Sequence, residues 1–428
     1  MSNPFDSAEY KRSRKSYIAY STFEYFVSIL ATDVFLAKLL TNIGLEDSLI
    51  GIVSSIISLA CIFQLLALLL MKKISSIKKA VMIFAPCSQI LFMAMYITPF
   101  LPVSASVKAV LVIAFLVLAY VCHYMIFSPL FKWANSYVAP DHRGVYSATK
   151  EMISLASGIV FTLIVGYVLD YFELSDNING VFLFIASSIL ILSICNVVFL
   201  LMIKKDTPSK QEVQSSSLKE VLRNTLGNRN FVNIVIMSSM WQVARYLTVG
   251  FLGTFKTNDL LLSVGTVQVI NMVANLCRFF ISRPFGRYSD RTSYAKGVKL
   301  ALLITSVGFI ANAFTNRDFW WGIVIYTIFY AVGLAGTNQN ASNIVYSYVD
   351  SKYTAQAMAI KSSIGGVCGF VASLLGSRIL TFVQENGNTF LGIPMYGQQL
   401  LSFLSFLIII ACVLFIQFVI EKQKVLVQ

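Results

Sequence analysis

The chain has 428 residues, of which 57% are hydrophobic and only 12% are charged. Such an apolar composition excludes a soluble globular domain and indicates a polytopic membrane protein. The net charge of +13 does not indicate nucleic-acid binding, because the cations occur in short groups between apolar runs instead of sharing one surface.

The chain opens with a polar and basic stretch, residues 1–16, that lacks the short apolar core of a secretory leader. We therefore expect no removable signal peptide. The seven cysteines all lie within apolar runs without metal-ligand spacing, so we expect core thiols, with no disulfide, no metal and no cofactor. Catalytic motifs are missing and the loops are too short for a catalytic domain, which predicts a protein that is not an enzyme.

Long apolar runs dominate the rest of the chain. A membrane-spanning helix needs about 20 mainly apolar residues, and twelve runs satisfy this rule. They cover about 17–40, 47–71, 80–100, 107–137, 145–172, 180–203, 230–255, 262–285, 297–315, 319–348, 354–383 and 397–420. We therefore predict an all-α polytopic membrane protein with twelve transmembrane helices in two pseudo-symmetric halves. Residues 1–203 form the N-terminal six-helix bundle, 204–229 a cytoplasmic linker and 230–428 the C-terminal six-helix bundle.

The basic residues indicate the orientation. Lys and Arg concentrate in the N-terminal stretch, in the linker and in every second loop, while the opposite loops carry few cations and several acids. By the positive-inside rule both termini are cytoplasmic. We expect a monomer in the plasma membrane, specifically a bacterial inner membrane, in contact with lipid.

An internal repeat supports the division into two halves. Residues 137–150 can be laid on 348–361 without a gap, which places Lys150 on Lys361. Two halves related by duplication fit the plan of parallel-repeat transporters. Two cations at matching positions could bind an anion from both sides, or could anchor the helices at the level of the lipid phosphates.

Residues 283–299 are a basic segment between two apolar runs, and we expect a tight turn at a membrane surface there. Gly286, Asp290 and Arg291 have the spacing Gly-x-x-x-Asp-Arg. With six plus six spans and a basic central loop, this segment resembles the loop motif of the major facilitator superfamily of secondary transporters. The turn at 140–144 is similar to a second turn of that family. The segment departs from the family pattern at Ser293, where the family has glycine.

The resemblance implies that Gly286, Asp290 and Arg291 form a conformational latch. The physical reasoning agrees, because a carboxylate can lie near the positive N-terminus of a neighbouring helix and pair with a cation in one conformational state. The alternative is that these residues only cap and solvate a loop. In the matching segment of the first half, Ser76 stands where the aspartate would be, so any such latch acts from the second half alone.

Ionisable residues within spans are costly in a membrane and are therefore candidates for function. We predict that Glu24, Asp33 and Glu151 include the proton-coupling group. Glu24 is the preferred carrier, and a fixed ion pair with Lys150 or Lys132 is the competing interpretation. His123 lies in mid-span, where it could titrate or be a satisfied buried histidine.

The eighth span has a polar stripe at helical spacing, formed by Gln268, Asn271, Asn275, Arg278 and Ser282. Such a stripe faces a cavity or hydrogen-bonds to a neighbouring helix, because lipid cannot satisfy its donors. Shorter polar faces occur in the fourth, seventh and tenth spans. The predicted solute-binding residues are Lys132, Lys150, Trp241, Gln242, Arg245, Gln268, Asn271, Asn275, Arg278, Asn340, Asn343 and Lys361.

We therefore predict a secondary active transporter that moves a small polar, possibly anionic, solute by alternating access, driven by protons. The excess of cations over acids within the spans favours an anion. A proton-coupled drug or metabolite efflux pump is an alternative, since Glu24 or Asp33 could form an acidic site. A sugar or polyol permease is another, given the amide side chains, and a membrane sensor or lipid-handling protein is a third.

Overall fold

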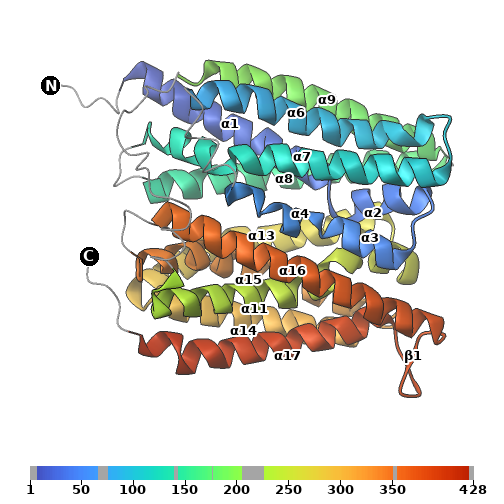
Figure 1. Ribbon diagram of the computed structural model, residues 1–428. Helices are drawn as coiled ribbons and strands as arrows, with labels where there is room; N and C mark the ends of the chain where they lie inside the picture. The colour runs from blue at the N-terminus through green and yellow to red at the C-terminus, as the bar shows by residue number, and fades with distance from the viewer. Residues whose placement is uncertain are drawn as a thin grey trace. The chain divides into compact units, whose positions relative to one another are not determined.

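The computed structural model describes residues 7–65, 76–138, 143–175, 177–204, 226–349 and 354–423, which are almost entirely helical (Figure 1). Within these ranges, ten helices are long and apolar enough to cross a membrane. Two further helical segments, which begin at Ala8 and Arg229, are less apolar and lie outside that group. The predicted all-α polytopic fold is confirmed, and the helices are consistent with twelve spans.

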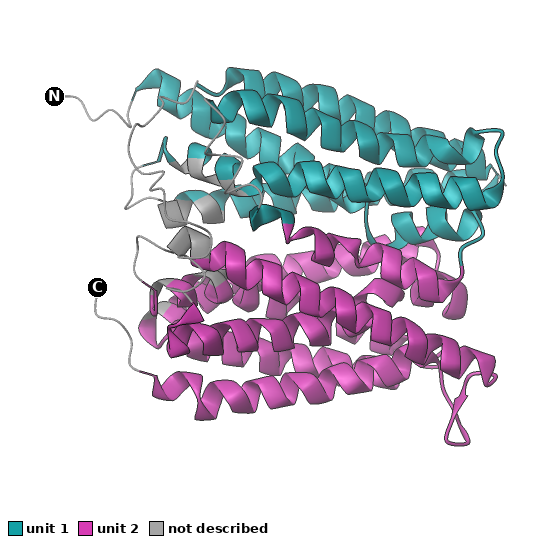
Figure 2. Cartoon of the chain, in the orientation of Figure 1, with its two compact units in different colours: residues 1–45, 63–214 teal, residues 46–62, 215–428 magenta. Residues whose placement is uncertain are grey.

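The helices form two compact units (Figure 2). Unit 1 comprises residues 1–45 and 63–214, and unit 2 comprises 46–62 and 215–428. Most of the predicted linker lies outside the described residues. Residues 140–142 of the turn at 140–144 also lie outside them.

Unit 1 is a bundle of long helices. Its elements are α1 (Ala8–Leu30), α2 (Asp33–Asn42), α6 (Ile77–Ile97), the 3-10 turn η2 (Thr98–Phe100), α7 (Ala105–Asn135), α8 (Arg143–Leu174) and α9 (Ile178–Met202). Side chains define where two of them begin. Ser7 caps α1 by accepting a hydrogen bond from the Tyr10 amide, and Asn177 caps α9 by accepting one from the Gly180 amide.

Polar contacts fix one end of unit 1 around a core of buried aromatic and aliphatic side chains. Arg14 donates from its guanidinium to the Tyr137 carbonyl at 2.9 Å. The Tyr146 hydroxyl donates to the Arg14 carbonyl at 2.9 Å, and the Trp133 indole donates to the Tyr137 hydroxyl at 2.7 Å. These bonds connect α1, α7 and α8 at the end of the bundle where the chain is most basic, so this end is firmly packed.

Unit 2 contains a second bundle. Its helices are α3 (Asp47–Ser54), α4 (Ile56–Ala60), α11 (Arg229–Thr248), α12 (Leu252–Thr254), α13 (Val264–Arg291), α14 (Tyr294–Ala313), α15 (Trp321–Tyr346), α16 (Thr354–Glu385) and α17 (Gly397–Phe418), with short turns η4 (Val249–Phe251), η5 (Phe255–Asp259) and η6 (Ile420–Lys422). Between α16 and α17, the two-residue strands β1 (Thr389–Phe390) and β2 (Ile393–Pro394) pair antiparallel (Figure 1).

Residues 46–62 belong to unit 2 although they form most of the second predicted span. The Ser58 hydroxyl donates to the Gly366 carbonyl at 2.9 Å, and the Ser363 hydroxyl donates to the Cys61 carbonyl at 3.2 Å. A Cβ at Gly366 would overlap the Ser58 carbonyl oxygen. Gly366 therefore lets α16 pack closely against α4.

Three predicted spans are interrupted within the described residues, and the second of them in the chain, 47–71, is divided into α3 and α4 at Ser55. The first run, 17–40, is divided into α1 and α2 by Ala31 and Thr32, and Asp33 has a φ of 50°. Aspartate tolerates this left-handed conformation better than most residues. The Tyr96 hydroxyl donates to the Leu30 carbonyl, which stabilises the end of α1. The seventh run likewise ends as a regular α-helix at Thr248 and continues through η4, α12 and the π-helical turn η5.

The predicted turn over 283–299 is mostly wrong. Helix α13 continues to Arg291, and α14 begins at Tyr294. Only Thr292 and Ser293 form the turn, because Ser293 adopts extended backbone and caps α14 by accepting a hydrogen bond from the Lys296 amide. The basic residues that predicted a loop therefore extend a long helix past the apolar run.

Carboxylates gather at the end of unit 2 opposite this turn. Asp47 accepts a hydrogen bond from the Asn258 amide at 3.0 Å, and Asp259 accepts one from the Gln398 amide at 3.1 Å. Burial, followed by the nearby charge of Asp47, raises the pKa of Asp259 to about 6. The charge of Arg317 acts in the opposite direction.

Candidate functional site

The acid predicted to carry protons lies between two hydrogen-bonding partners in unit 1. The Glu24 carboxylate on α1 accepts a hydrogen bond from the Tyr20 hydroxyl at 3.2 Å, one helical turn away. The same oxygen, Oε1, lies 3.2 Å from Nδ1 of His123 on α7. The side chains of His123 and Glu24 are 26% and 27% exposed. The pair is thus held in place but is not sealed from exchange.

A lysine completes this cluster. The Lys150 ammonium on α8 lies 5.5 Å from the centroid of the Tyr17 ring, which stacks on Tyr20 with 6.3 Å between centroids. Glu24 and Glu151 are the two carboxylates whose charges act on Lys150. Three of the predicted residues, Glu24, Lys150 and Glu151, therefore come together in one electrostatic group within unit 1.

Asp33 and Lys132 are the other two charged residues predicted in this half. Asp33 begins α2, beyond the break that ends α1. An acid in the first turn of a helix interacts favourably with the helix dipole, so Asp33 has a local role there. Lys132 lies on α7, and its side chain is outside the described part of the chain.

In unit 2, two predicted arginines come together at one tyrosine. Arg245 is on α11 and Arg278 is on α13, and both lie close enough to the Tyr330 hydroxyl on α15 to act on it electrostatically. Arg245 also places its guanidinium 5.1 Å from the centroid of the Tyr246 ring. Two guanidiniums and a phenol hydroxyl converging from three helices can donate several hydrogen bonds to one carboxylate or phosphate.

Aromatic rings adjoin these arginines. The rings of Trp241 and Tyr330 lie 6.3 Å apart between centroids, and Tyr330 stacks on Tyr326 at 5.4 Å. Phe309 contacts both tyrosines at 6.2 and 5.2 Å. Such a rigid group of rings can hold Tyr330 in a fixed position and offers a flat apolar surface beside the cations.

The polar stripe of α13 faces away from lipid. Between Val264 and Ser282, the exposed residues of this helix are Val269, Val273, Leu276 and Phe280, which are all apolar. At 3.6 residues per turn these lie on nearly the opposite side of the helix from Gln268, Asn271, Asn275 and Arg278. Gln268 is buried, and Asn271, Asn275 and Arg278 are half-buried. The polar stripe therefore lies on the less exposed side of α13.

The remaining predicted solute residues of unit 2 occupy varied positions. The side chain of Gln242 packs against Gly365, and its buried Oε1 makes no hydrogen bond within the described residues. Asn340 is buried against Gly297 and donates to the carbonyl one turn earlier. Asn343 is half-buried. Lys361 is 7% exposed and donates to the Ala341 carbonyl. Asn340 and Lys361 thus have packing partners of their own, whereas Gln242 keeps an acceptor oxygen available.

The residues of the predicted latch, Gly286, Asp290 and Arg291, all lie on the last turns of α13. Gly286 is half-buried and Arg291 is exposed. The side chain of Asp290 is outside what the structure describes, so its pairing stays a prediction.

Two members of these clusters were not among the residues predicted for the site. Tyr20 and Tyr330 are aromatic residues in apolar runs, where sequence reasoning expects core or interface positions. A signal existed for each, because Tyr20 lies one helical turn from Glu24 and Tyr330 lies one turn from Tyr326. His123 was predicted to be either a titrating group or a buried core residue, and in the structure it contacts Glu24.

Comparison with known proteins adds a family and a fold. The profile of the Major Facilitator Superfamily matches residues 17–373. No curated protein sequence matches the chain.

Similar solved structures include a mutant of the nucleoside transporter NupG, with a TM-score of 0.70, 14% identity, and coverage of 95% of this chain and 98% of that chain. They also include a D-xylose-proton symporter (TM-score 0.68, 12% identity, 92% and 96% coverage). A third is a POT family transporter in complex with a thioalcohol-conjugated peptide (0.69, 13%, 94% and 96%). At such low identities these likenesses are informative about the fold alone.

Proposed function

Because this chain belongs to the Major Facilitator Superfamily, we propose that it is a secondary transporter that moves a small anionic solute together with protons. The family and the similar structures are transporters, not enzymes. The nature of the solute and the coupling to protons are the parts that we infer from the two clusters.

The observation that carries the proposal is the Glu24 carboxylate held between Tyr20 and His123 within a membrane-spanning bundle. An acid in a span is costly unless it is neutralised or paired. Glu24 can be neutralised by a proton, and its histidine partner can also hold one. Lys150 lies near enough for its charge to interact with that of the carboxylate. The cluster therefore has two states that differ by one proton, which is what a coupling site requires.

Unit 2 supplies the complementary half of the proposal. The six predicted spans from residue 230 onward contain no Asp or Glu, yet Arg245 and Arg278 converge on Tyr330 there. Buried cations are best stabilised by a negative charge. We infer that the solute carries a negative charge, because the guanidinium groups of Arg245 and Arg278 are suited to bind a carboxylate or a phosphate.

Joint passage of an anion and a proton has a physical advantage. Either charge alone would cross a region of low dielectric constant at high cost, whereas the two together carry no net charge when the anion is monovalent. Protons moving down their gradient can therefore drive the solute, which is the basis of symport.

The first experiment identifies the solute. The purified protein is screened for thermal stabilisation by organic acids, phosphorylated compounds, amino acids, nucleosides, sugars and amphipathic drugs, since a ligand of the folded state raises apparent stability by mass action. We expect anions to stabilise most. Stabilisation by cationic drugs alone, with resistance gained by a pump-deficient host, would instead favour the efflux alternative.

The second experiment tests the coupling. The protein is reconstituted into proteoliposomes, and uptake of the externally added stabilising anion is measured with and without an inward proton gradient. We expect the gradient to drive accumulation and an uncoupler to abolish it. Equal accumulation with and without the gradient contradicts proton coupling, and a dependence on sodium would assign the coupling ion differently.

A further inference from the structure

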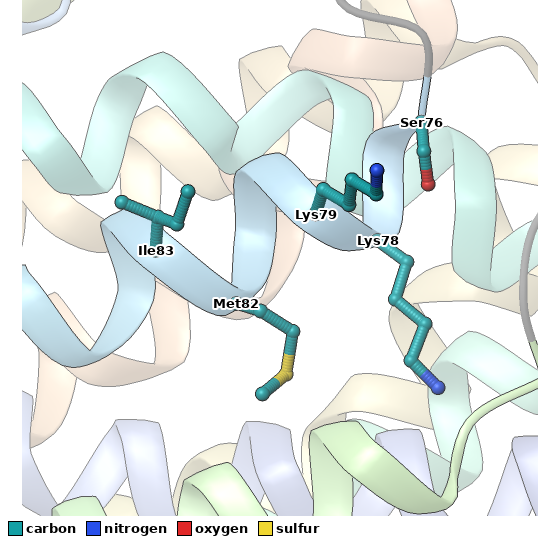
Figure 3. A pocket seen from close by; sticks show the side chains of 5 residues that line it. All are labelled: Ser76, Lys78, Lys79, Met82 and Ile83. Carbon is teal, nitrogen blue, oxygen red and sulfur yellow. The ribbon is translucent and has the colours of Figure 1, made fainter.

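The start of α6 in unit 1 presents two parallel rows of side chains. Lys78 and Met82 are one helical turn apart, and so are Lys79 and Ile83. In each row a cation lies at the helix end and an apolar side chain lies one turn further into the span. Together with Ser76 they line a pocket of about 400 Å³ (Figure 3).

The two lysines of this pocket have different roles. The Lys78 ammonium donates to the Leu201 and Ile203 carbonyls at the end of α9, at 2.9 and 2.5 Å. It thereby satisfies carbonyls that a helix end leaves without partners. Lys79 is exposed and makes no ion pair with any residue that the structure describes. Figure 3 shows the two side chains leaving the helix in different directions.

The electrostatics of this helix end favour an anion. No acidic residue lies in the first turn of α6, and Ser76 at its N-cap makes no side-chain capping bond. A helix N-terminus is itself partly positive, so a negatively charged group is stabilising there. Two lysines at that place add to the positive potential, and only Lys78 has its charge directed to carbonyls.

An apolar track leads from Lys79 along the exposed face of α6. Ile83 is 66% exposed, Ile90 is 49% exposed and Ile97 is 39% exposed. These residues recur every seven positions, so they lie along one side of the helix. On a helix of this length and hydropathy, such a face contacts lipid chains. A cation at the head of an apolar track matches the two chemical halves of a phospholipid.

We propose that the first turn of α6 binds an anionic phospholipid, with the lipid phosphate at the Lys79 ammonium and an acyl chain along Ile83 and Ile90. The stems of Lys78 and Lys79 and the side chain of Met82 form the apolar wall of the pocket. The site lies outside both clusters assigned to transport and is independent of them. A soluble anion would leave Met82 and Ile83 in contact with water, so the lipid is the better occupant.

The test compares lipids on the full-length purified protein. Thermal stability is measured in detergent with added phosphatidylglycerol, with phosphatidylcholine of the same chains, and with inorganic phosphate. We expect phosphatidylglycerol to raise the melting temperature by several degrees more than phosphatidylcholine, and inorganic phosphate to have no effect. Lys79→Gln should lose at least half of the phosphatidylglycerol-specific shift, and Lys79→Arg should retain it.

A matched control is Lys296→Gln, which removes an exposed lysine from the first turn of α14, a helix with a capped N-terminus. This variant should keep the full lipid effect. Ile83→Gln should reduce the shift given by long-chain phosphatidylglycerol while leaving Lys79 in place. The proposal is overturned if Lys79→Gln keeps the full shift, if the two lipids stabilise equally, or if inorganic phosphate reproduces the effect.

Discussion

The polar clusters of the two units differ in the charge that they hold. In unit 1, one carboxylate is surrounded by a tyrosine, a histidine and a lysine, all able to donate to it. In unit 2, two arginines meet at a tyrosine, and the predicted spans from residue 230 onward provide no acid. The first cluster holds a carboxylate, to which we assign the proton in our proposal. The second combines two guanidiniums with a phenol hydroxyl, a set of donors suited to an anion.

The largest effect should come from neutralising the acid of unit 1. Glu24→Gln keeps the size of the side chain but cannot carry a proton, so accumulation of solute driven by a proton gradient should fall at least tenfold. Solute exchange without a gradient should stay within about twofold of wild type, because the anion site is in unit 2. Glu9→Gln, which removes the exposed acid of α1 that pairs with Lys204, is the control. Equal losses of accumulation and exchange would contradict the separation of roles.

The next effect concerns affinity. Arg278→Ala or Arg245→Ala should weaken solute binding by about 10- to 100-fold, because a hydrogen bond to a charged group contributes ~1.5–3 kcal/mol. The dependence of the remaining transport on protons should persist. Titration calorimetry with the solute found in the screen measures the change, and Arg287→Ala, an exposed arginine of the same helix, should bind normally. Wild-type affinity in both variants would remove the anion site from unit 2.

A smaller effect tests where residues 46–62 belong. Gly366→Ala places a methyl group against the Ser58 carbonyl oxygen, whereas Gly365→Ala places one 3.3 Å from the flexible Gln242 side chain. Overpacking against a backbone atom typically costs about 1–3 kcal/mol. We therefore expect the melting temperature to drop by several degrees in Gly366→Ala and by little in Gly365→Ala. Equal melting temperatures would mean that α4 does not pack tightly on α16.

The smallest effect distinguishes the role of Asp259, which lies outside the spans, from the role proposed for Glu24. The pKa of Asp259 is raised to about 6, so the folded state binds more protons than the unfolded state between about pH 4 and 6. Stability is therefore highest below pH 4, falls as the pH rises through about 6 and is then constant. Asp259→Asn removes this loss.

Above pH 6 the Asp259→Asn variant should be more stable than wild type by on the order of 1 kcal/mol, after allowance for screening by solvent. Near pH 4 the two should be equal. Thermal unfolding at both pH values measures the difference, and transport coupling should be unchanged. A shift in the proton dependence of transport would give Asp259 the role assigned to Glu24.

Local patterns in the sequence predicted much of this arrangement. The polar stripe of α13 followed from helical spacing alone, because one face of a membrane helix must avoid lipid. The meeting of Glu24 with His123 did not follow, since ion pairing between helices depends on how they pack and turn. The break after Leu30 was missed because the apolar run continues through it, and the helical end of α13 was missed because basic residues were taken to mark a loop.

The hydrogen bond between Ser58 and Gly366 has a consequence for biosynthesis. The two residues are 308 positions apart in the chain, and a ribosome adds about 5–20 residues per second. The segment carrying Ser58 is therefore made roughly 15–60 s before its partner exists. During that interval its polar backbone contacts and small-residue surface have no final neighbour, so the first half cannot complete its folding as it emerges. The segment that carries Ser58 can therefore reach its final packing only after α16 has been synthesised.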